Sequence, residues 1–183
     1  MLQMEQKDYK MEIINLLLHG NDHARSMAKK ININHMTINR KLNELLNENV
    51  VDFNLIGRNQ SYFLKHTAES LTFIKMAEYY KLLSFLRKYP QMRNIIEIIK
   101  NDKRISLAAI FGSYAKGVPS IESDIDLFIE TQDSSIKKEY LLFDSKLSIK
   151  IGVLSSESPL AQEIIKNHVI IKGVEKFYEE VNY

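Results

Sequence analysis

Two apolar strands with two short polar motifs between them place the strongest constraint on the fold of residues 104–183. Residues 105–111 read as a buried strand, and Gly112-Ser113 follows it directly. Ten residues later, Asp124-Ile125-Asp126 opens a second apolar run. Because residues i and i+2 of a strand point to the same face, Asp124 and Asp126 are expected to converge. The spacing predicts two carboxylates beside a glycine turn at one edge of a sheet.

This arrangement suits a metal-bound nucleotide. Two clustered carboxylates repel each other unless a cation lies between them, and Mg²⁺ prefers oxygen ligands that it can share with phosphates. Gly112 removes a side chain where the backbone would approach a phosphate, and Ser113 supplies a hydroxyl and a helix N-terminus. An isolated Asp-x-Asp is often only a solvated loop edge, and an isolated Gly-Ser only a turn. Both motifs at this spacing, each beside an apolar strand, make a stronger signal.

Residues 111–117, taken together with residues 123–127, resemble the minimal nucleotidyltransferases of the polymerase beta superfamily. The resemblance implies that Mg²⁺-dependent catalysis depends on Asp124 and Asp126 as metal ligands. It also implies a nucleotide site made by Gly112, Ser113 and Lys116. The implied reaction moves a nucleoside monophosphate from a nucleoside triphosphate, with ATP as the expected donor, to an acceptor. Residues 163–173 resemble archaeal members that carry an N-terminal winged helix.

The family also has a third carboxylate on a later strand, and here Lys150 occupies the expected position within residues 147–154. If that strand pairs beside residues 124–129, alternation places Lys150 on the face of the acidic pair and sends Val153 into the core. A protonated lysine cannot bind Mg²⁺, so we expect nucleotide binding with weak or absent transfer. Glu130 and Asp144 are the alternative third carboxylates.

Residues 8–65 show three helical segments followed by a strand, a turn and a return strand, the order of a winged helix-turn-helix. Residues 36–45 and the turn at residues 57–59 resemble the recognition helix and wing of winged-helix transcription regulators. Ile38, Leu42 and Leu45 would hold this helix on its scaffold. The residues expected to contact duplex DNA are Thr37, Asn39, Arg40, Lys41 and Arg58. A winged helix used for protein contacts is the alternative.

Residues 67–103 are expected to form a helical connector that Pro90 interrupts. Its apolar side chains occupy more than one helical face, so it should be buried against another surface. They are Leu71, Ile74, Met76, Ala77, Tyr80, Leu83 and Phe85. The connector therefore either packs on its own two domains or forms a homodimer seam.

Composition excludes several kinds of protein. The chain has no cysteine, which excludes disulfides, thiolate metal sites and cysteine nucleophiles. No apolar run reaches about eighteen residues, and the N-terminus lacks the apolar core of a signal peptide, so we expect a cytoplasmic protein without a membrane partner. Lys and Arg outnumber Asp and Glu by nine to seven in residues 1–66, but residues 105–183 carry eight against twelve. The two halves are expected to meet different partners.

The predicted fold class is α/β (α+β). It comprises a winged helix-turn-helix in residues 1–66, the connector in 67–103, and a mixed-sheet nucleotidyltransferase domain in 104–183. The expected activity is Mg²⁺-dependent nucleotidyl transfer to an unknown acceptor, such as a protein side chain or a small molecule. The alternative is a DNA-binding regulator whose degenerate nucleotidyltransferase domain only binds nucleotide.

Overall fold

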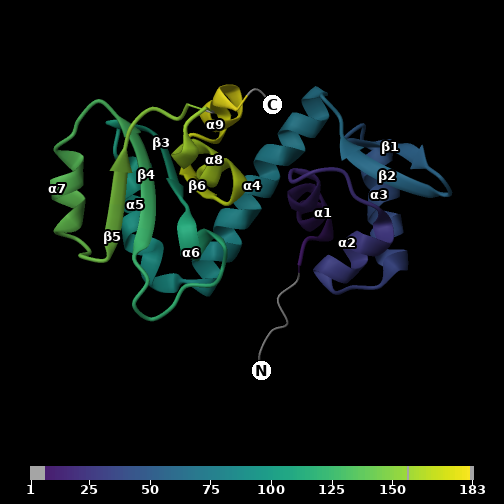
Figure 1. The fold of residues 1–183 in the computed structure, drawn as a ribbon, viewed down its shortest axis with the longest axis horizontal. Helices are drawn as coiled ribbons and strands as arrows, with labels where there is room; N and C mark the ends of the chain where they lie inside the picture. Colours follow the sequence, from purple (N-terminus) through teal and green to yellow (C-terminus); the bar gives the residue numbers. More distant parts are fainter. Residues whose placement is uncertain (1–6, 156, 182–183) are drawn as a thin grey trace. The chain divides into compact units, whose positions relative to one another are not determined.

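The computed structural model describes residues 7–155 and 157–181, and the chain divides into two compact units, residues 1–80 and 81–183 (Figure 1). Helix α4 (Ala68–Lys88) contributes residues to both units. The division falls at Tyr80-Lys81, inside the helical segment 67–103.

The first unit consists of three helices followed by a two-stranded antiparallel hairpin, which is the order predicted for residues 8–65. The elements are α1 (Tyr9–Leu17), α2 (Ala24–Ile31), α3 (His35–Asn47), β1 (Val51–Ile56) and β2 (Asn59–Leu64). Asp8 caps α1 by accepting hydrogen bonds from the backbone N–H groups of Lys10 and Met11. Asn34 caps α3 in the same way, by accepting from the N–H of Met36 at 2.7 Å.

Helix α3 is anchored as the sequence predicts, because Ile38, Leu42 and Leu45 are fully buried. The hairpin reverses at Gly57-Arg58, where Gly57 adopts a φ of +62°. Glycine adopts a positive φ at such a turn position without a steric penalty.

Helix α4 buries only part of its apolar surface within the described chain. Ile74 and Ala77 are fully buried, whereas Met76 and Leu83 are 48% and 46% exposed. Burial of these two side chains against another surface, such as a homodimer seam, stays a prediction. The break at Pro90 occurs as predicted, with a 3₁₀ turn, η1 (Pro90–Met92), leading into α5 (Arg93–Asn101).

The second unit is built on a four-stranded mixed sheet with the order β5-β4-β3-β6. The strands are β3 (Ile105–Ile110), β4 (Ile125–Thr131), β5 (Leu147–Ile151) and β6 (Val169–Lys172). β3 pairs antiparallel with β4 and with β6, whereas β4 and β5 are parallel and are joined through the short helix α7 (Ile136–Leu141).

Helices cover both faces of this sheet. One face contributes Ile125, Leu127 and Ile129 of β4 to a core that includes residues of α4, α5 and α7. On the other face lie α8 (Pro159–Lys166) and α9 (Val174–Glu180), which Figure 1 draws beside β3 and β6. Asp126, Phe128 and Glu130 alternate with the core residues and therefore point to this second face.

Strand β5 is shorter than predicted. It ends at Ile151, and Val153 is 71% exposed. The expectation that Val153 enters the core is wrong, because the chain leaves the sheet before the alternation reaches that residue. Among the described residues, none of the helices combines the length and apolar character needed to cross a membrane.

Candidate functional site

The site begins where β3 gives way to a tight glycine turn. The backbone N–H of Phe111 donates a hydrogen bond to the carbonyl oxygen of Asp126 at 3.0 Å, which fixes the end of β3 against the start of β4. Gly112 follows with a φ of +67°, and a Cβ atom built at this position would overlap the carboxylate of Asp126. The positive φ favours glycine at position 112, and a Cβ there would push the carboxylate of Asp126 aside.

Asp124 and Asp126 lie at the amino end of β4. Asp124 is exposed and directly precedes the strand, while Asp126 is half-buried on the face that carries α8 and α9. Neither carboxylate has a hydrogen bond or an ion pair with another residue in the ranges 7–155 and 157–181. Both are therefore available to a ligand.

The residues expected to bind nucleotide flank this pair. Gly112 and Ser113 open α6 (Gly112–Ala115), a single turn of helix, and Ser113 is half-buried. Lys116 is exposed, and its Nζ forms an ion pair of 3.3 Å with Oε1 of Glu163 on α8. A phosphate bound by Lys116 would therefore compete with Glu163.

The register between β4 and β5 shows which residues of β5 lie next to the acidic pair. Asp126 pairs with Ser148, and Phe128 pairs with Lys150. Lys150 therefore lies on the same face as Asp126 but one pair further along the sheet, and its side chain is exposed. The direct cross-strand neighbour of Asp126 is a hydroxyl group.

The two alternative carboxylates lie in different places. Glu130 is four residues from Asp126 on the same strand, which corresponds to about 13 Å of extended chain. It also bonds Lys176 at 2.7 Å, so it cannot share a cation with Asp126. Asp144 precedes β5, at the same end of the sheet as Asp124, and its Oδ1 accepts a hydrogen bond from the N–H of Lys146 at 2.9 Å.

The residues present fit a shared magnesium site rather than a closed protein cage. No group of three or more His, Asp or Glu side chains that could hold a metal occurs among the described residues. Mg²⁺ commonly binds through one or two carboxylates together with substrate phosphates, so Asp124 and Asp126 are a sufficient protein contribution. The close approach of Gly112 leaves the Asp126 carboxylate next to bare backbone, where a phosphate could share the cation.

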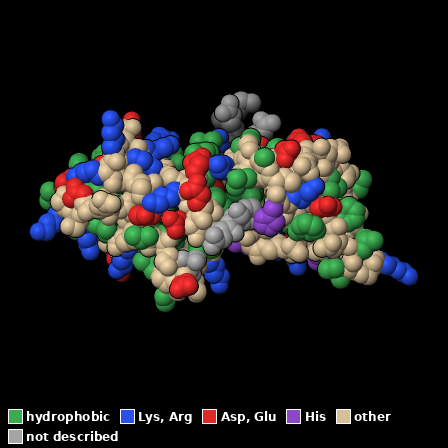
Figure 2. Space-filling view, turned by 90° about the horizontal axis from the view of Figure 1, so that it is seen from above, with side chains coloured by type: hydrophobic (Ala, Val, Ile, Leu, Met, Phe, Trp, Pro, Cys, Tyr) green, Lys and Arg blue, Asp and Glu red, His purple; other side chains and the backbone are tan. Residues whose placement is uncertain are grey.

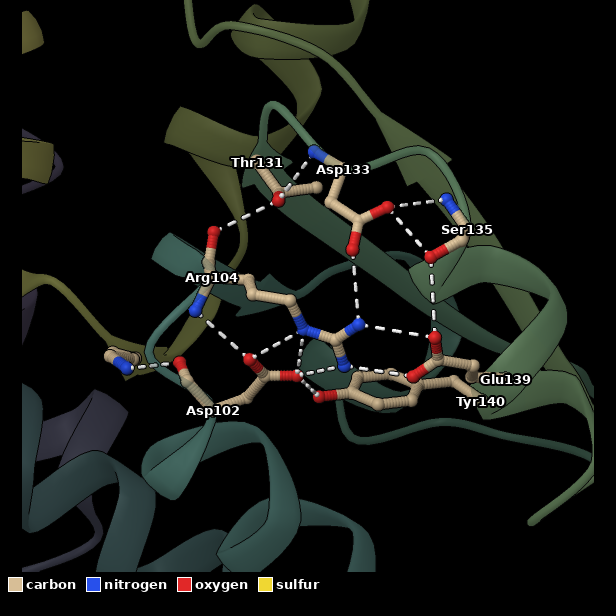
Figure 3. Close-up of polar contacts among 8 residues, drawn as sticks. Asp102, Arg104, Thr131, Asp133, Ser135, Glu139 and Tyr140 are labelled. Atoms are coloured by element: carbon tan, nitrogen blue, oxygen red, sulfur yellow. Dashed lines mark hydrogen bonds and ion pairs between the residues drawn. The ribbon is translucent and has the colours of Figure 1, made fainter.

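A second polar cluster, which the sequence did not reveal, lies at the opposite end of β4 and is centred on Arg104 (Figure 3). The guanidinium of Arg104 donates to Asp102 at 2.8 Å, to Asp133 at 3.0 Å and to Glu139 at 2.8 Å. The hydroxyl of Tyr140 also donates to Asp102, at 2.8 Å. The cluster ties the start of β3 to the end of β4 and to α7.

The hydrogen bonds from Arg104 hold the pKa of the Asp102 carboxyl well below its usual range, although burial acts in the opposite direction. The hydrogen bonds that Arg104 donates to Glu139 and then to Asp102 raise the pKa of Arg104. Burial, followed by the hydrogen bond to Asp102, raises the pKa of Tyr140. No sequence motif links these residues; spacing along the chain gave no sign that they meet.

The residues expected to contact DNA lie on α3 and on the hairpin of the first unit. Arg40 and Arg58 are exposed, whereas Thr37 and Asn39 are half-buried. Lys41 forms an ion pair of 2.8 Å with Glu44, so its charge is partly compensated within α3.

Three comparisons connect the chain to known proteins. Residues 93–176 match the family described as "Polymerase beta, Nucleotidyltransferase". A Methanocaldococcus jannaschii protein named "Putative protein adenylyltransferase" is 29% identical over 91 residues, which are 46% of this chain and 85% of that protein. Among solved structures, the transcriptional repressor BigR from Xylella fastidiosa is similar over 39% of this chain and 70% of its own, with a TM-score of 0.35 and 14% identity. Residues 93–176, which include the glycine turn and both carboxylates, thus match a nucleotidyltransferase of the polymerase beta superfamily.

Proposed function

We propose that the second unit transfers a nucleoside monophosphate from a nucleoside triphosphate, with ATP as the expected donor, and that Asp124 and Asp126 hold Mg²⁺. The observation that carries the proposal is the packing of Gly112 against Asp126. It leaves a half-buried carboxylate beside bare backbone and without an ionic partner among the described residues. Such a carboxylate is poised to share a cation with a phosphate.

In the proposed reaction, the residues around Asp126 bind the metal and the phosphates. Asp124 and Asp126 would hold Mg²⁺, which would stabilise the negative charge on the attacking and leaving oxygens. Ser113 and the backbone at Gly112 donate hydrogen bonds to the phosphates, and Lys116 exchanges Glu163 for a phosphate oxygen. An acceptor oxygen attacks the α-phosphorus, the bond to the oxygen that bridges to the β-phosphate breaks, pyrophosphate leaves, and the acceptor proton passes to solvent.

The test of the site is calorimetry with ATP and Mg²⁺. Asp126→Asn keeps the shape of the side chain but removes a charge and a metal ligand, so we expect Mg²⁺-dependent affinity to fall at least tenfold. Glu122→Gln, which removes an exposed charge two residues from Asp124, should change it little. Equal binding by the wild type and Asp126→Asn would place the nucleotide elsewhere.

Transfer requires its own experiment, because Ser148 and Lys150 stand where a third carboxylate would activate the acceptor. The wild type is incubated with labelled ATP and Mg²⁺, with and without lysate of the source cells. Label on a protein supports an acceptor of the kind named in the M. jannaschii relative, and label on a small molecule supports a metabolite. Binding without transfer supports a domain that senses nucleotide in a DNA-binding regulator.

Duplex DNA binding by a winged helix in the first unit is a second proposal. Its support is a hollow of roughly 360 Å³ beside the start of α2, the start of α3 and the hairpin, with no acidic side chain among its lining residues. The lining includes His23, Arg25, His35, Asn39 and Arg58. Positive side chains beside a protruding helix and hairpin suit contact with phosphates.

A gel-shift series at increasing salt tests this proposal. Arg40→Ala and Arg58→Ala should each weaken binding and reduce the salt dependence by a slope of about 0.9 per lost phosphate contact. Lys41→Ala is the matched comparison and should weaken binding less, because Glu44 already compensates its charge. Absent or salt-independent binding to genomic fragments would favour a protein-contact role.

A further inference from the structure

A second hollow, of about 570 Å³, lies in the second unit at the carboxyl ends of the parallel strands β4 and β5. It is lined by Arg104, Ser106, Glu130, Thr131, Gln132, Asp133, Val153 and Lys176. Ligands of sheets with parallel strands commonly bind at the carboxyl ends of those strands. The hollow is separate from Asp124 and Asp126, which lie at the amino end of β4.

Its wall contains a buried carboxylate with an unsatisfied oxygen. Glu130 is only 8% exposed, and its Oε1 accepts a hydrogen bond from Lys176 at 2.7 Å. Its Oε2 is buried and has no hydrogen-bond partner among the described residues. A buried acceptor without a donor is destabilising, so a group that donates a hydrogen bond to it makes a favourable contact.

The other polar groups of the wall have little capacity left for a ligand. Arg104 is occupied by three carboxylates, and the Ser106 hydroxyl donates to the carbonyl of Glu130 while accepting from Lys176. The Thr131 hydroxyl donates to the carbonyl of Arg104 and accepts from the N–H of Asp133. What the wall still offers is the acceptor at Glu130 and the exposed side-chain amide of Gln132.

The charge that lines the hollow is balanced. Arg104 and Lys176 bring two positive charges to the wall, and Glu130 and Asp133 bring two negative ones. No net positive charge therefore repels a cationic ligand, and the spare acceptor of Glu130 favours a ligand that donates a hydrogen bond. Figure 2 shows acidic and basic side chains interspersed over the face that it views.

We infer that this hollow binds a compact organic cation, a primary amine or a guanidinium, which donates a hydrogen bond to Oε2 of Glu130. Exposed Val153 contacts the methylene groups of the ligand. The side chain of Lys176 is one-third exposed on a flexible stem, and it is the part of the wall that moves to admit the donor. The site does not depend on nucleotide binding at Asp126.

The experiment is a titration of the full-length ¹⁵N-labelled chain with 1,4-diaminobutane, followed by NMR, with 1,4-butanediol as the uncharged analogue. We expect saturable shifts of the amide signals of Thr131, Gln132 and Lys176 with the diamine and none with the diol. Glu130→Gln should weaken the affinity at least tenfold, because it removes the charge that the ligand meets. Val153→Trp should weaken it similarly by filling the hollow from an exposed position, so the test survives if the first variant does not fold.

Glu97→Gln, on the exposed face of α5, is the control for nonspecific attraction of a cation to acidic side chains. It should bind the diamine as the wild type does. The inference is overturned by the absence of saturable shifts in the wild type, by equal binding of the diol, or by equal weakening in Glu97→Gln and Glu130→Gln. It is also overturned if Val153→Trp binds with unchanged affinity.

Discussion

At the scale of single residues, Gly112 is restricted twice. A residue with a Cβ at its φ of +67° costs about 1 kcal/mol or more, and that Cβ would also displace the carboxylate of Asp126. Gly112→Ala should therefore lower the free energy of unfolding by more than about 1 kcal/mol in a denaturant titration, and should also weaken ATP binding. Gly152→Ala is the matched control, since that glycine has no positive φ and a Cβ there would lie 3.9 Å from Phe128. Similar losses of stability and of ATP affinity in both variants would mean that position 112 has no particular requirement for glycine.

The register of β5 gives a second prediction at this scale. Ser148 faces Asp126 directly, whereas Lys150 lies one pair further along. A carboxylate at position 148 would join the acidic pair, so Ser148→Asp should raise Mg²⁺ affinity more than Lys150→Asp does. Calorimetry with Mg²⁺ and ATP measures both, and a transfer assay shows whether either variant gains activity. A larger gain from Lys150→Asp would show that the third position is 150.

At the scale of secondary-structure elements, the loops before β4 and β5 bring exposed apolar side chains to the end of the sheet that holds the acidic pair. Lys146 connects the two loops. Its Nζ donates to the carbonyl of Ile121 at 3.3 Å, and its own carbonyl accepts from the N–H of Ile125 at 2.8 Å. Ile121 is 94% exposed, and Leu142 and Phe143 are 89% and 63% exposed. An apolar surface of this kind suits contact with a protein.

If the acceptor is a protein, as one form of the proposed function has it, this surface should help to bind it. Ile121→Asp and Phe143→Asp should then reduce transfer to the protein acceptor severalfold while leaving ATP affinity unchanged. Val153→Asp changes an equally exposed apolar residue at the other end of the sheet and serves as the control. Unchanged transfer in both loop variants would remove the surface from the acceptor site.

The sequence predicted the secondary-structure elements better than it predicted the contacts between them. Apolar periodicity located α3, the hairpin and the strands β3 and β4, because each pattern repeats within a few residues. It assigned Lys150 to the correct face, but alternation alone cannot say how far one strand slides along another, so Ser148 was missed. Contacts between distant segments are hidden from local patterns in the same way, which is why the pairing of Glu130 with Lys176 escaped prediction.

At the scale of the whole molecule, the Arg104 cluster should make stability depend on acidity. The folded-state pKa values of Asp102, Asp133 and Glu139 lie below their ordinary values, chiefly through hydrogen bonds to Arg104 or, for Asp133, to Ser135. This stabilisation is complete above the unfolded-state values near pH 4 and is lost as the pH falls towards the folded-state values.

Thermal unfolding of the wild type and of Arg104→Gln at pH 7 and pH 3 measures this contribution. The wild type should be the more stable protein at pH 7, and the difference between the two should shrink at pH 3. A difference that stays constant between the two pH values would mean that the cluster stabilises through packing rather than charge. Glu97→Gln, which removes an exposed charge outside the cluster, should show no such pH dependence.

Strand β4 carries Asp126 near one end and Glu130 near the other, on the same face and with buried Phe128 between them. Side chains alternate strictly along an extended strand, so inserting one residue would turn all the side chains after it to the opposite face. Over evolutionary time, substitutions can therefore change either end of β4 independently, whereas a single insertion or deletion between them would reverse one end relative to the other. We expect related chains to vary in the identity of these residues but to keep their number.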